Sequence, residues 1–278
     1  MGVVINFPSL IENYNLDTSD ATATANDISI GKTAYVNGEK LTGISEQNVE
    51  WIDNASGSID SCYDSTNDIY YSNIQKYLKK IIIPYGITSI GDGVFRNCTG
   101  LTSVTIPSSV TSIGISAFEN CTGLTTITIP DSVTSIGKSA FSKCSRLTTI
   151  TIPYGVTSIK FGTFLSCLSL TSVAIPDSVA SIGGRAFSYC SSLTTITIPN
   201  SVTSIEYSAF HDCTGLITIT IPDSVTSIGD HAFYECTSLA HIYYKGTQNQ
   251  WDAITKDTNW NKNMGSNVTG GTVIHYNS

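Results

Sequence analysis

The sequence predicts an α/β repeat solenoid, in which successive coils of the chain stack along one axis. Three residue types recur with a fixed step of 23 residues through most of the chain. A repeat of about 20 to 50 residues is typical of stacked coils, because one coil cannot bury its apolar face alone and neighbouring coils bury it together. The prolines are Pro84, Pro107, Pro130, Pro153, Pro176, Pro199 and Pro222; the phenylalanines are Phe95, Phe118, Phe141, Phe164, Phe187, Phe210 and Phe233; the leucines are Leu78, Leu101, Leu124, Leu147, Leu170, Leu193, Leu216 and Leu239.

The first part of each coil is predicted to be a β-strand. In the stretch L-T-T-I-T-I, inward Ile127 and Ile129 alternate with outward Thr126 and Thr128, which is strand periodicity. Pro130 then ends the ladder, because proline has no N–H to donate. Stacked strands of this kind form one parallel sheet. Its outward positions include Ser103, Thr105, Thr126, Thr128, Thr149, Thr151, Ser172, Thr195, Thr197, Thr218 and Thr220.

The second part of each coil is predicted to return through a short helical turn. After the proline, Val133 and Ile136 point inward, and Ala140, Phe141 and Cys144 follow at helix-like spacing. Together with the inward residues of the strand, these positions give each coil a thin share of a continuous core.

A glycine follows the last inward isoleucine in most coils. Gly137 is a candidate for a left-handed bend, which glycine adopts without steric cost. Lys160 and Glu206 fill the same column in other coils, so a positive φ is not obligatory there.

The repeat L-x-x-I-x-I-P-x-x-V-x-x-I-G-x-x-A-F-x-x-C resembles the BspA-like leucine-rich-repeat family, found on bacterial and some protist surfaces. The resemblance covers about Leu78 to Tyr244. It implies a curved parallel sheet on the concave side of the solenoid, with short helical turns on the other side. It also implies adhesion or protein recognition, although a fold alone does not prove a function.

Seven cysteines share one column near the end of each coil, and Cys62 lies out of phase. Neighbouring parallel strands lie about 4.8 Å apart, which is within disulfide range. The side chains of one column point the same way, however, and seven is an odd number. Each coil offers a single sulfur and the chain contains no C-x-x-C, which disfavours a metal site. We therefore predict that these cysteines pack as small buried apolar residues. They are Cys98, Cys121, Cys144, Cys167, Cys190, Cys213 and Cys236.

The ends of the chain differ from the repeat, and four parts are predicted. They are an attachment module (1–44), a cap or linker (45–77), the solenoid (78–245) and a C-terminal cap (246–278). In the first part, residues 20–30 are predicted to form a short helix, and Asn37-Gly38 is a strong hairpin signal. Its motif D-A-T-A-x-A-x-D-I-x-x-G-K-T-A-Y-V-N-G-x-K-x-T-G is similar to a small module of phage and prophage tail proteins.

The C-terminal cap is predicted to cover the last coil. Thr247 and Gln250 have the spacing of a capping box, which opens a helix. Trp251 and Ile254 of that helix can lie over the coil. A final strand is predicted over 272–276. Such caps protect the open edge of a sheet, which would otherwise pair with other chains.

Composition excludes several classes of function. The net charge of −8 leaves no basic stripe for nucleic acid. No apolar run approaches the about 20 residues of a membrane-spanning helix, and the start M-G-V-V-I-N-F-P lacks the pattern of a signal peptide. A P-loop, G-x-S-x-G and G-x-G-x-x-G are all absent from the sequence. We therefore expect no enzymatic activity, no cofactor and no metal.

Comparison of the coils with one another locates a candidate recognition surface. Columns that stay constant are explained by packing, whereas three exposed columns beside the turn vary. The columns are Asp92, Ile115, Lys138, Phe161, Gly184, Tyr207 and Asp230; Arg96, Glu119, Ser142, Leu165, Ser188, His211 and Tyr234; and Asn97, Asn120, Lys143, Ser166, Tyr189, Asp212 and Glu235. Exposed apolar and aromatic residues indicate a binding patch. Neutral drift, or contact with a cap or a sister chain, would explain the variation equally. The predicted ligand-binding residues are Ile115, Lys138, Phe161, Leu165, Tyr189, Tyr207, His211 and Tyr234.

The sequence therefore predicts a non-enzymatic adhesion or binding protein that works outside the cell that makes it. Its expected partner is a protein or glycan on a target cell surface. The alternative is a phage or prophage tail component with a host-facing solenoid, since the N-terminal motif resembles a tail module and no signal peptide is expected. The sequence does not fix the oligomeric state.

Overall fold

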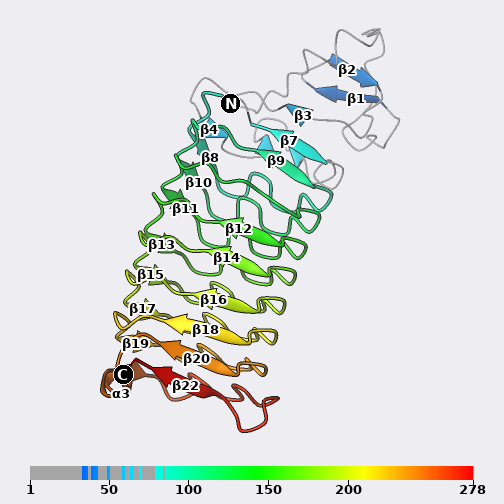
Figure 1. The fold of residues 1–278 in the computed structure, drawn as a ribbon. Coiled ribbons are helices and arrows are strands. Elements are labelled where there is room, and N and C mark those ends of the chain that lie inside the picture. The colour runs from blue at the N-terminus through cyan, green and yellow to red at the C-terminus, as the bar shows by residue number, and fades with distance from the viewer. Residues whose placement is uncertain are drawn as a thin grey trace.

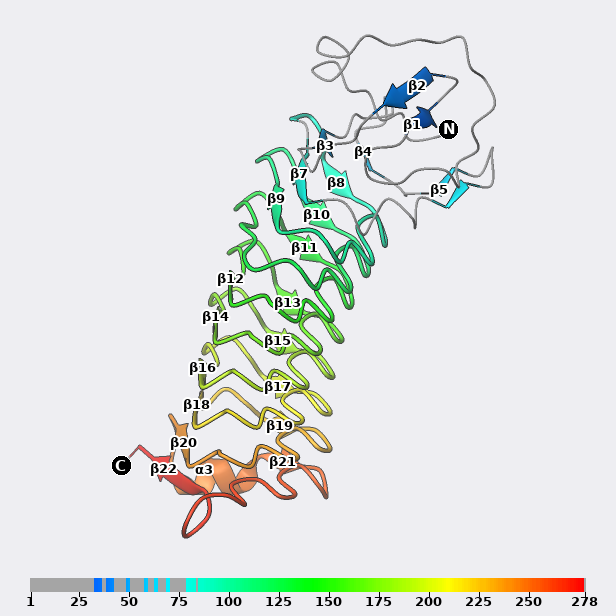
Figure 2. The same ribbon diagram turned by 90° about the vertical axis from the view of Figure 1, so that its right-hand side faces the viewer.

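The computed structural model describes residues 33–36, 39–42, 49–50, 58–59, 63–64, 69–70, 79–83 and 85–277, with side chains from residue 79 onward. The helix expected over 20–30, Cys62 and most of the expected N-terminal cap lie outside these residues. From residue 79 onward the chain winds into coils that stack as an elongated column (Figures 1 and 2).

Two short antiparallel pairs lie N-terminal to the column in sequence. Strand β1 (Thr33–Val36) pairs with β2 (Glu39–Thr42), which confirms the hairpin predicted around Asn37-Gly38. Strand β5 (Tyr63–Asp64) pairs with β6 (Ile69–Tyr70).

The strands predicted at the start of the coils form parallel ladders, which we call together the threonine sheet. Neighbouring strands pair with the 23-residue step, as between Thr195 and Thr218. The sheet faces the viewer in Figure 1. Its strands are β3 (Val49–Glu50), β7 (Lys80–Ile82), β9 (Ser103–Thr105), β12 (Thr149–Thr151), β14 (Ser172–Ala174), β16 (Thr195–Thr197), β18 (Thr218–Ile221), β20 (His241–Tyr244) and β22 (Val273–Tyr276).

A second set of parallel strands, which the sequence did not reveal, lies at the left edge of the column in Figure 1. In the strands from β8 to β19 of this set, a serine is followed by the inward isoleucine that precedes the glycine column. We call this set the serine-isoleucine sheet. Its strands are β4 (Ser58–Ile59), β8 (Ser89–Ile90), β10 (Ser112–Ile113), β11 (Ser135–Ile136), β13 (Ser158–Ile159), β15 (Ser181–Ile182), β17 (Ser204–Ile205), β19 (Ser227–Ile228) and β21 (Thr255–Lys256).

The prediction of a short helical turn in each coil is wrong. Consecutive turns occupy the A-F-x-x-C segment, and two residues of each turn segment have a positive φ between 53° and 65°. Left-handed residues interrupt a right-handed helix. Backbone groups of the turn segments bond to the neighbouring coil instead: Phe118 N–H donates to the Ala140 carbonyl and Asn120 N–H to the Ser142 carbonyl, both at 2.8 Å. The left-handed columns are Gly93, Ser116, Ser139, Gly162, Arg185, Ser208 and His231, and Asn97, Asn120, Lys143, Ser166, Tyr189, Asp212 and Glu235.

The inward columns predicted from the repeat form the core. In the coil that starts at Leu124, every predicted inward residue is buried. The column of phenylalanines from Phe95 to Phe233 stacks ring on ring, with centroids 5.2 to 5.8 Å apart. Offset stacking of aromatic rings adds to the free energy gained by their burial, so this ladder ties each coil to the next.

The glycine column has a different cause from the one expected. Gly137 does not have a positive φ. A Cβ atom at this position would overlap the carbonyl group of Gly114 in the preceding coil, so close approach of the two backbones selects glycine. Two coils tolerate a side chain in this column: Lys160 Nζ donates to Ser135 Oγ at 3.0 Å, and a carboxylate oxygen of Glu206 accepts from a backbone N–H at 2.8 Å.

The C-terminal segment packs against the coil that contains Phe233. Helix α3 (Gln248–Ala253) carries both bonds of the capping box, because Gln250 N–H donates to the Thr247 hydroxyl and Thr247 N–H donates to the Gln250 side chain. Trp251 is buried, and the Trp260 ring meets Phe233 edge-on at 6.1 Å. Strand β22 confirms the expected final strand. None of the helices among the described residues is long and apolar enough to cross a membrane.

Candidate recognition surface

The three variable columns lie along the turn segments, which form one edge of the column of coils. We call this surface the turn edge. The third column is itself one of the left-handed columns, so its residues are held in a fixed and unusual backbone conformation. Tyr189 belongs to it, with φ 61°. The backbone N–H groups of this column donate to the next coil, as Tyr189 N–H does to the His211 carbonyl at 2.8 Å.

Exposure divides the eight predicted ligand-binding residues into two groups. Ile115, Tyr189 and Tyr207 are 48%, 45% and 48% exposed, and Lys138 is also exposed. The other four are partly buried, so their replacement would disturb packing as well as surface. They are Phe161, Leu165, His211 and Tyr234.

The structure brings Phe161 and Tyr207 together across one intervening coil. Their ring centroids are 6.2 Å apart. The intervening position is Gly184, where a Cβ atom would overlap the Tyr207 ring. The glycine thus makes room for the tyrosine to lie back over its coil. Ile115 and Lys138 precede Phe161 in the same column, one coil apart.

A second aromatic cluster surrounds His211. Its ring stacks on Tyr234 with centroids 5.0 Å apart and planes 6° apart, and the Tyr189 ring lies 5.3 Å away. His231, which the sequence did not place in the surface, joins the cluster 4.9 Å from Tyr234. Lys262 Nζ lies 5.8 Å from the centroid of the Tyr234 ring, in a cation–π contact. Leu165 belongs to neither ring cluster.

Carboxylates orient both histidines of the cluster. His211 Nδ1 lies 2.9 Å from Asp212 Oδ2, and His231 Nδ1 lies 2.7 Å from Asp230 Oδ2. Burial lowers the pKa of His211, and the neighbouring Asp212 opposes this effect only in part. At neutral pH the His211 imidazole is therefore neutral and donates its Nδ1 proton to the carboxylate.

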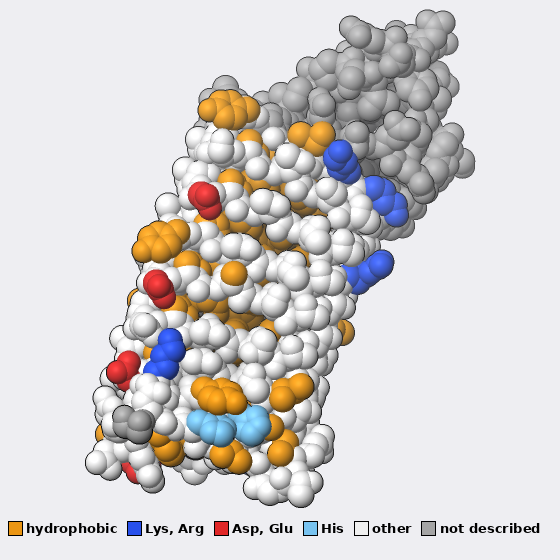
Figure 3. Space-filling model, in the orientation of Figure 1, with side chains coloured by type: hydrophobic (Ala, Val, Ile, Leu, Met, Phe, Trp, Pro, Cys, Tyr) orange, Lys and Arg blue, Asp and Glu red, His pale blue; other side chains and the backbone are white. Residues whose placement is uncertain are grey.

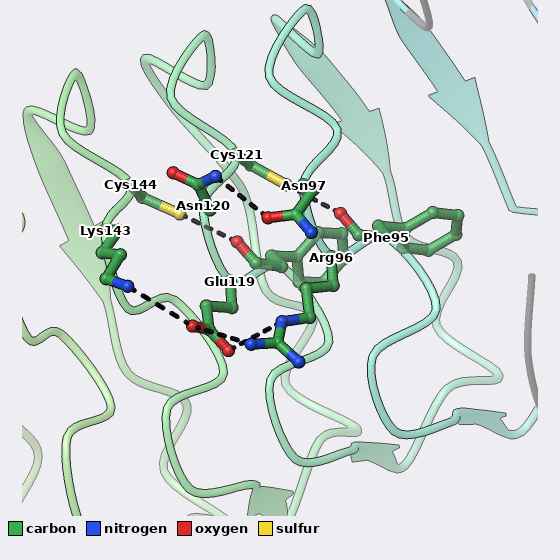
Figure 4. A network of polar contacts seen from close by, with 9 residues as sticks. Phe95, Arg96, Asn97, Glu119, Asn120, Cys121, Lys143 and Cys144 are labelled. Carbon is green, nitrogen blue, oxygen red and sulfur yellow. Dashed lines mark hydrogen bonds and ion pairs between the residues drawn. The ribbon is translucent and has the colours of Figure 1, made fainter. Parts of the chain in front are cut away.

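The N-terminal half of the turn edge is polar rather than aromatic (Figure 4). Glu119 lies 3.1 Å from Arg96 and 3.8 Å from Lys143, so one carboxylate bridges two cations on either side. Asn120 donates its side-chain N–H to the Asn97 side chain at 2.9 Å. The side chains of Arg96 and Lys143 are more than half exposed, and ion pairs at the surface contribute little to stability, about 0 to 1 kcal/mol. The turn edge therefore changes from charged to aromatic along the column.

The cysteine column lies directly beneath this edge and holds free, buried thiols, as predicted. The thiol of Cys144 donates to the Phe118 carbonyl of the preceding coil at 3.2 Å, and Cys121 makes the same bond to Phe95 at 3.1 Å (Figure 4). Burial raises the pKa of Cys144 to about 12. These thiols are therefore protonated donors that tie coils together. Among residues 79–83 and 85–277, His, Cys, Asp and Glu form no group suited to a metal ion.

Comparison with known proteins agrees with this architecture. The chain matches the family described as BspA type leucine-rich repeat region, in six copies over residues 65–194 and 157–259. The protein belongs to this family. A comparison with curated proteins gave no match.

Solved structures of bacterial leucine-rich-repeat proteins resemble this BspA-type chain. One is a T. pallidum leucine-rich-repeat protein, with 27% identity, a TM-score of 0.54, and 69% of this chain and 83% of that chain covered. Another is a leucine-rich cell surface protein from Faecalibacterium prausnitzii, with 23% identity, a TM-score of 0.38 and 82% and 90% covered. The resemblance of residues 18–44 to a phage tail module finds no support among these matches.

Proposed function

We propose that this BspA-type protein is a non-enzymatic binding protein that attaches to another surface outside the cell that makes it. The fold supports this proposal in general terms, because a solenoid is a rigid, extended scaffold whose repeated surface can be varied without loss of the core.

The observation that carries the proposal is the contrast between constant and variable columns within one chain. All coils have the same backbone fold and pack in the same way, so packing explains the columns whose residues stay constant. On the turn edge, Ile115, Tyr189 and Tyr207 are large side chains that remain about half exposed. Tyrosine is favoured at protein and glycan interfaces because its ring is apolar and its hydroxyl forms hydrogen bonds. The proposed partner is a protein or glycan on a target cell.

The test replaces these three residues together by serine and measures binding to an immobilised panel of extracellular-matrix proteins and cell-surface glycans. We expect the triple variant to lose the binding that the parent protein shows, with a melting temperature close to that of the parent. Phe161 and Leu165 are left intact because they are partly buried.

The matched control replaces Thr126, Thr128 and Thr149, which are outward residues of the threonine sheet, by serine. Here we expect unchanged binding. If the threonine variant lost binding and the turn-edge variant kept it, the turn edge would not be the recognition surface. If neither parent nor variant bound any member of the panel, the proposed adhesive function would lose its support.

A further inference from the structure

The threonine sheet is interrupted between β14 and β16. On one side of the gap Ile152 N–H donates to the Ala174 carbonyl at 3.1 Å, and on the other Ile198 N–H donates to the Thr220 carbonyl at 3.0 Å. The described structure contains no ladder between the two strands at the gap. The sheet is also broken between β9 and β12, where the inward residues stay buried. At the break between β14 and β16, by contrast, Val173 and Ile175 are only partly buried. Their counterparts in the described coils are buried: Ile81, Val104, Ile127, Ile150, Ile196, Ile219 and Ile242, and Ile83, Ile106, Ile129, Ile152, Ile198, Ile221 and Tyr244.

A hollow of about 390 Å³ opens at this interruption. Val173, Ala174 and Ile175 line it with apolar surface, and Asp177, Asn200 and Lys245 line it with polar groups. Its volume falls in the range of small-molecule sites, roughly 300 to 1,000 Å³. Ala174 is the one alanine in its outward column, where the other described coils carry Ile82, Thr105, Thr128, Thr151, Thr197, Thr220 and Tyr243. Its small side chain helps to keep the hollow open.

The polar groups of the hollow make opposite demands on a ligand. Lys245 Nζ reaches back over two coils and donates to Asn200 Oδ1 at 3.1 Å. In the described structure this is its only hydrogen bond, and it forms no ion pair. An ammonium has three donors and attracts an anion. Among the described residues, the Asp177 carboxylate accepts no hydrogen bond. A ligand in the hollow could therefore donate a hydrogen bond to it.

We propose that this hollow binds a carboxylated sugar, with the sugar carboxylate on Lys245 and its hydroxyl groups on Asp177, Asn200 and Thr197. A sugar acid carries an anion and several hydroxyl donors on one small rigid ring, which meets both demands at once. The C–H face of the ring suits the apolar surface of Ala174 and Pro199. An acidic peptide would supply the anion, but its donors are backbone N–H groups rather than the several hydroxyls of one small ring.

An aromatic platform extends the same face toward the C-terminal end. Tyr243 lies in the outward column of Ala174 and Thr197, and its ring is 45% exposed. It stacks on His275 with centroids 4.6 Å apart, and His275 Nε2 lies 3.0 Å from His241 Nδ1, which holds the stack in place. Two coils, about 10 Å, separate Tyr243 from Thr197. Figure 3 shows histidine side chains beside apolar side chains near the C-terminal end of this face. A further sugar of an acidic oligosaccharide would stack there.

The experiment titrates the full chain with glucuronic acid and with N-acetylneuraminic acid, and follows saturable binding by calorimetry and NMR. Glucose tests the need for a carboxylate, and N-acetylglutamate tests the need for a sugar. We expect the sugar acids to bind and both comparison compounds to bind at least tenfold more weakly. Equal binding of glucose would overturn the role of Lys245, and equal binding of N-acetylglutamate would make the hollow a site for acidic peptides. Absence of binding by both sugar acids would overturn the proposal.

Two variants test the hollow itself. Lys245→Gln can keep the contact with Asn200 but removes the charge, and we expect roughly a tenfold or larger loss of affinity. Ala174→Thr restores the usual residue of the column and fills the hollow, with a similar loss and an unchanged melting temperature. Lys79→Gln, at an exposed lysine near the N-terminal end of the described coils, is the matched control and should bind as the parent does. Parent-like affinity of both hollow variants would disprove the site. The turn-edge variants test a different surface, so the two proposals succeed or fail separately.

Discussion

At the scale of single residues, each coil repeats the same inward side chains and the same two positions with a positive φ. The inward columns followed from periodicity alone, because the same apolar residues return every 23 positions. The left-handed columns were missed because Lys143, Ser166 and Tyr189 give no sign of a positive φ. Asn97, Asn120 and Asp212 in the same column were the available signal, since asparagine and aspartate are the residues that most readily adopt this conformation after glycine.

The cysteine column leads to a prediction about pH. Burial raises the pKa of Cys144 from 9.0 to about 12 and also raises the pKa of Cys167 and Cys190. Below pH 9 both the folded and the unfolded chain keep these protons, so stability is complete. Above pH 9 only the unfolded chain releases them. The free energy of unfolding should therefore fall by about 1.4 kcal/mol per pH unit for each such thiol, up to the folded pKa.

Urea denaturation between pH 7 and pH 11 measures this loss. Other groups titrate in the same range, so Cys144→Ala is the comparison: its stability should fall less steeply above pH 9 than that of the parent, by the share of one thiol. Identical slopes would contradict the role assigned to burial. Alkylation of the unfolded chain followed by mass spectrometry should show that all the in-phase cysteines are free thiols. A disulfide between two of them would remove both thiols from the titration.

At the scale of elements, the strands of the threonine sheet were predictable and the serine-isoleucine strands were not. A two-residue strand such as β11 is too short to show alternation, so only its inward isoleucine was visible in the sequence. The prediction of a helical turn in each coil was wrong for a related reason. The spacing of Ala140, Phe141 and Cys144 fits one turn of helix, but the same spacing is satisfied by consecutive turns whose N–H groups bond to the next coil. The sequence pattern of a single coil contains no information on that partner.

The geometry of the candidate recognition surface could be predicted from the sequence only in part. Variation among the coils pointed to Tyr207 and Phe161, and the structure brings these rings together. Variation among the coils could not show that His231 joins the His211 cluster, because these two residues lie in different columns. The interruption between β14 and β16 was equally hidden, since its cause lies in the contact between two coils. The single visible trace was Ala174 in a column dominated by threonine.

The C-terminal helix gives a prediction at this scale. Thr247→Ala removes the hydroxyl that accepts the Gln250 N–H, and we expect a loss of about 1 kcal/mol of stability. Trp251→Ala should cost more, about 3 to 5 kcal/mol, because this buried ring packs edge-on against Tyr244 and Trp260 at 5.1 and 6.0 Å. It should also make the protein self-associate by uncovering the last coil. Chemical denaturation and light scattering measure the two effects. Thr258→Ala, an exposed threonine in the loop beyond the helix, is the control and should change neither.

At the scale of the whole molecule, the ladders that run through the core and the two sheets each connect one coil to the next. The phenylalanine ladder, the cysteine thiols and both sheets all connect neighbours related by the 23-residue step. Such a column behaves as a one-dimensional array, in which stability is close to a sum over coils and their interfaces. The number of coils is then not fixed by the fold, whereas the phase between them is.

Removing one whole coil should therefore leave a folded protein. Deletion of residues 148–170 joins Leu147 to Thr171 and keeps every column in phase. We expect a soluble monodisperse protein with the parent's type of circular dichroism spectrum. Its free energy of unfolding should be lower by about 1 to 3 kcal/mol, the share of 23 residues in an ordinary domain.

The control removes about half a coil, residues 148–158, which joins Leu147 to Ile159. This junction skips a strand of the threonine sheet and places the following columns out of register with those before it. A slip of this kind moves inward residues to the surface, so we expect aggregation or loss of cooperative unfolding. If the half-coil deletion were as stable as the whole-coil deletion, stability would not depend on the phase between neighbouring coils. The account of the core as a set of in-phase ladders would then be wrong.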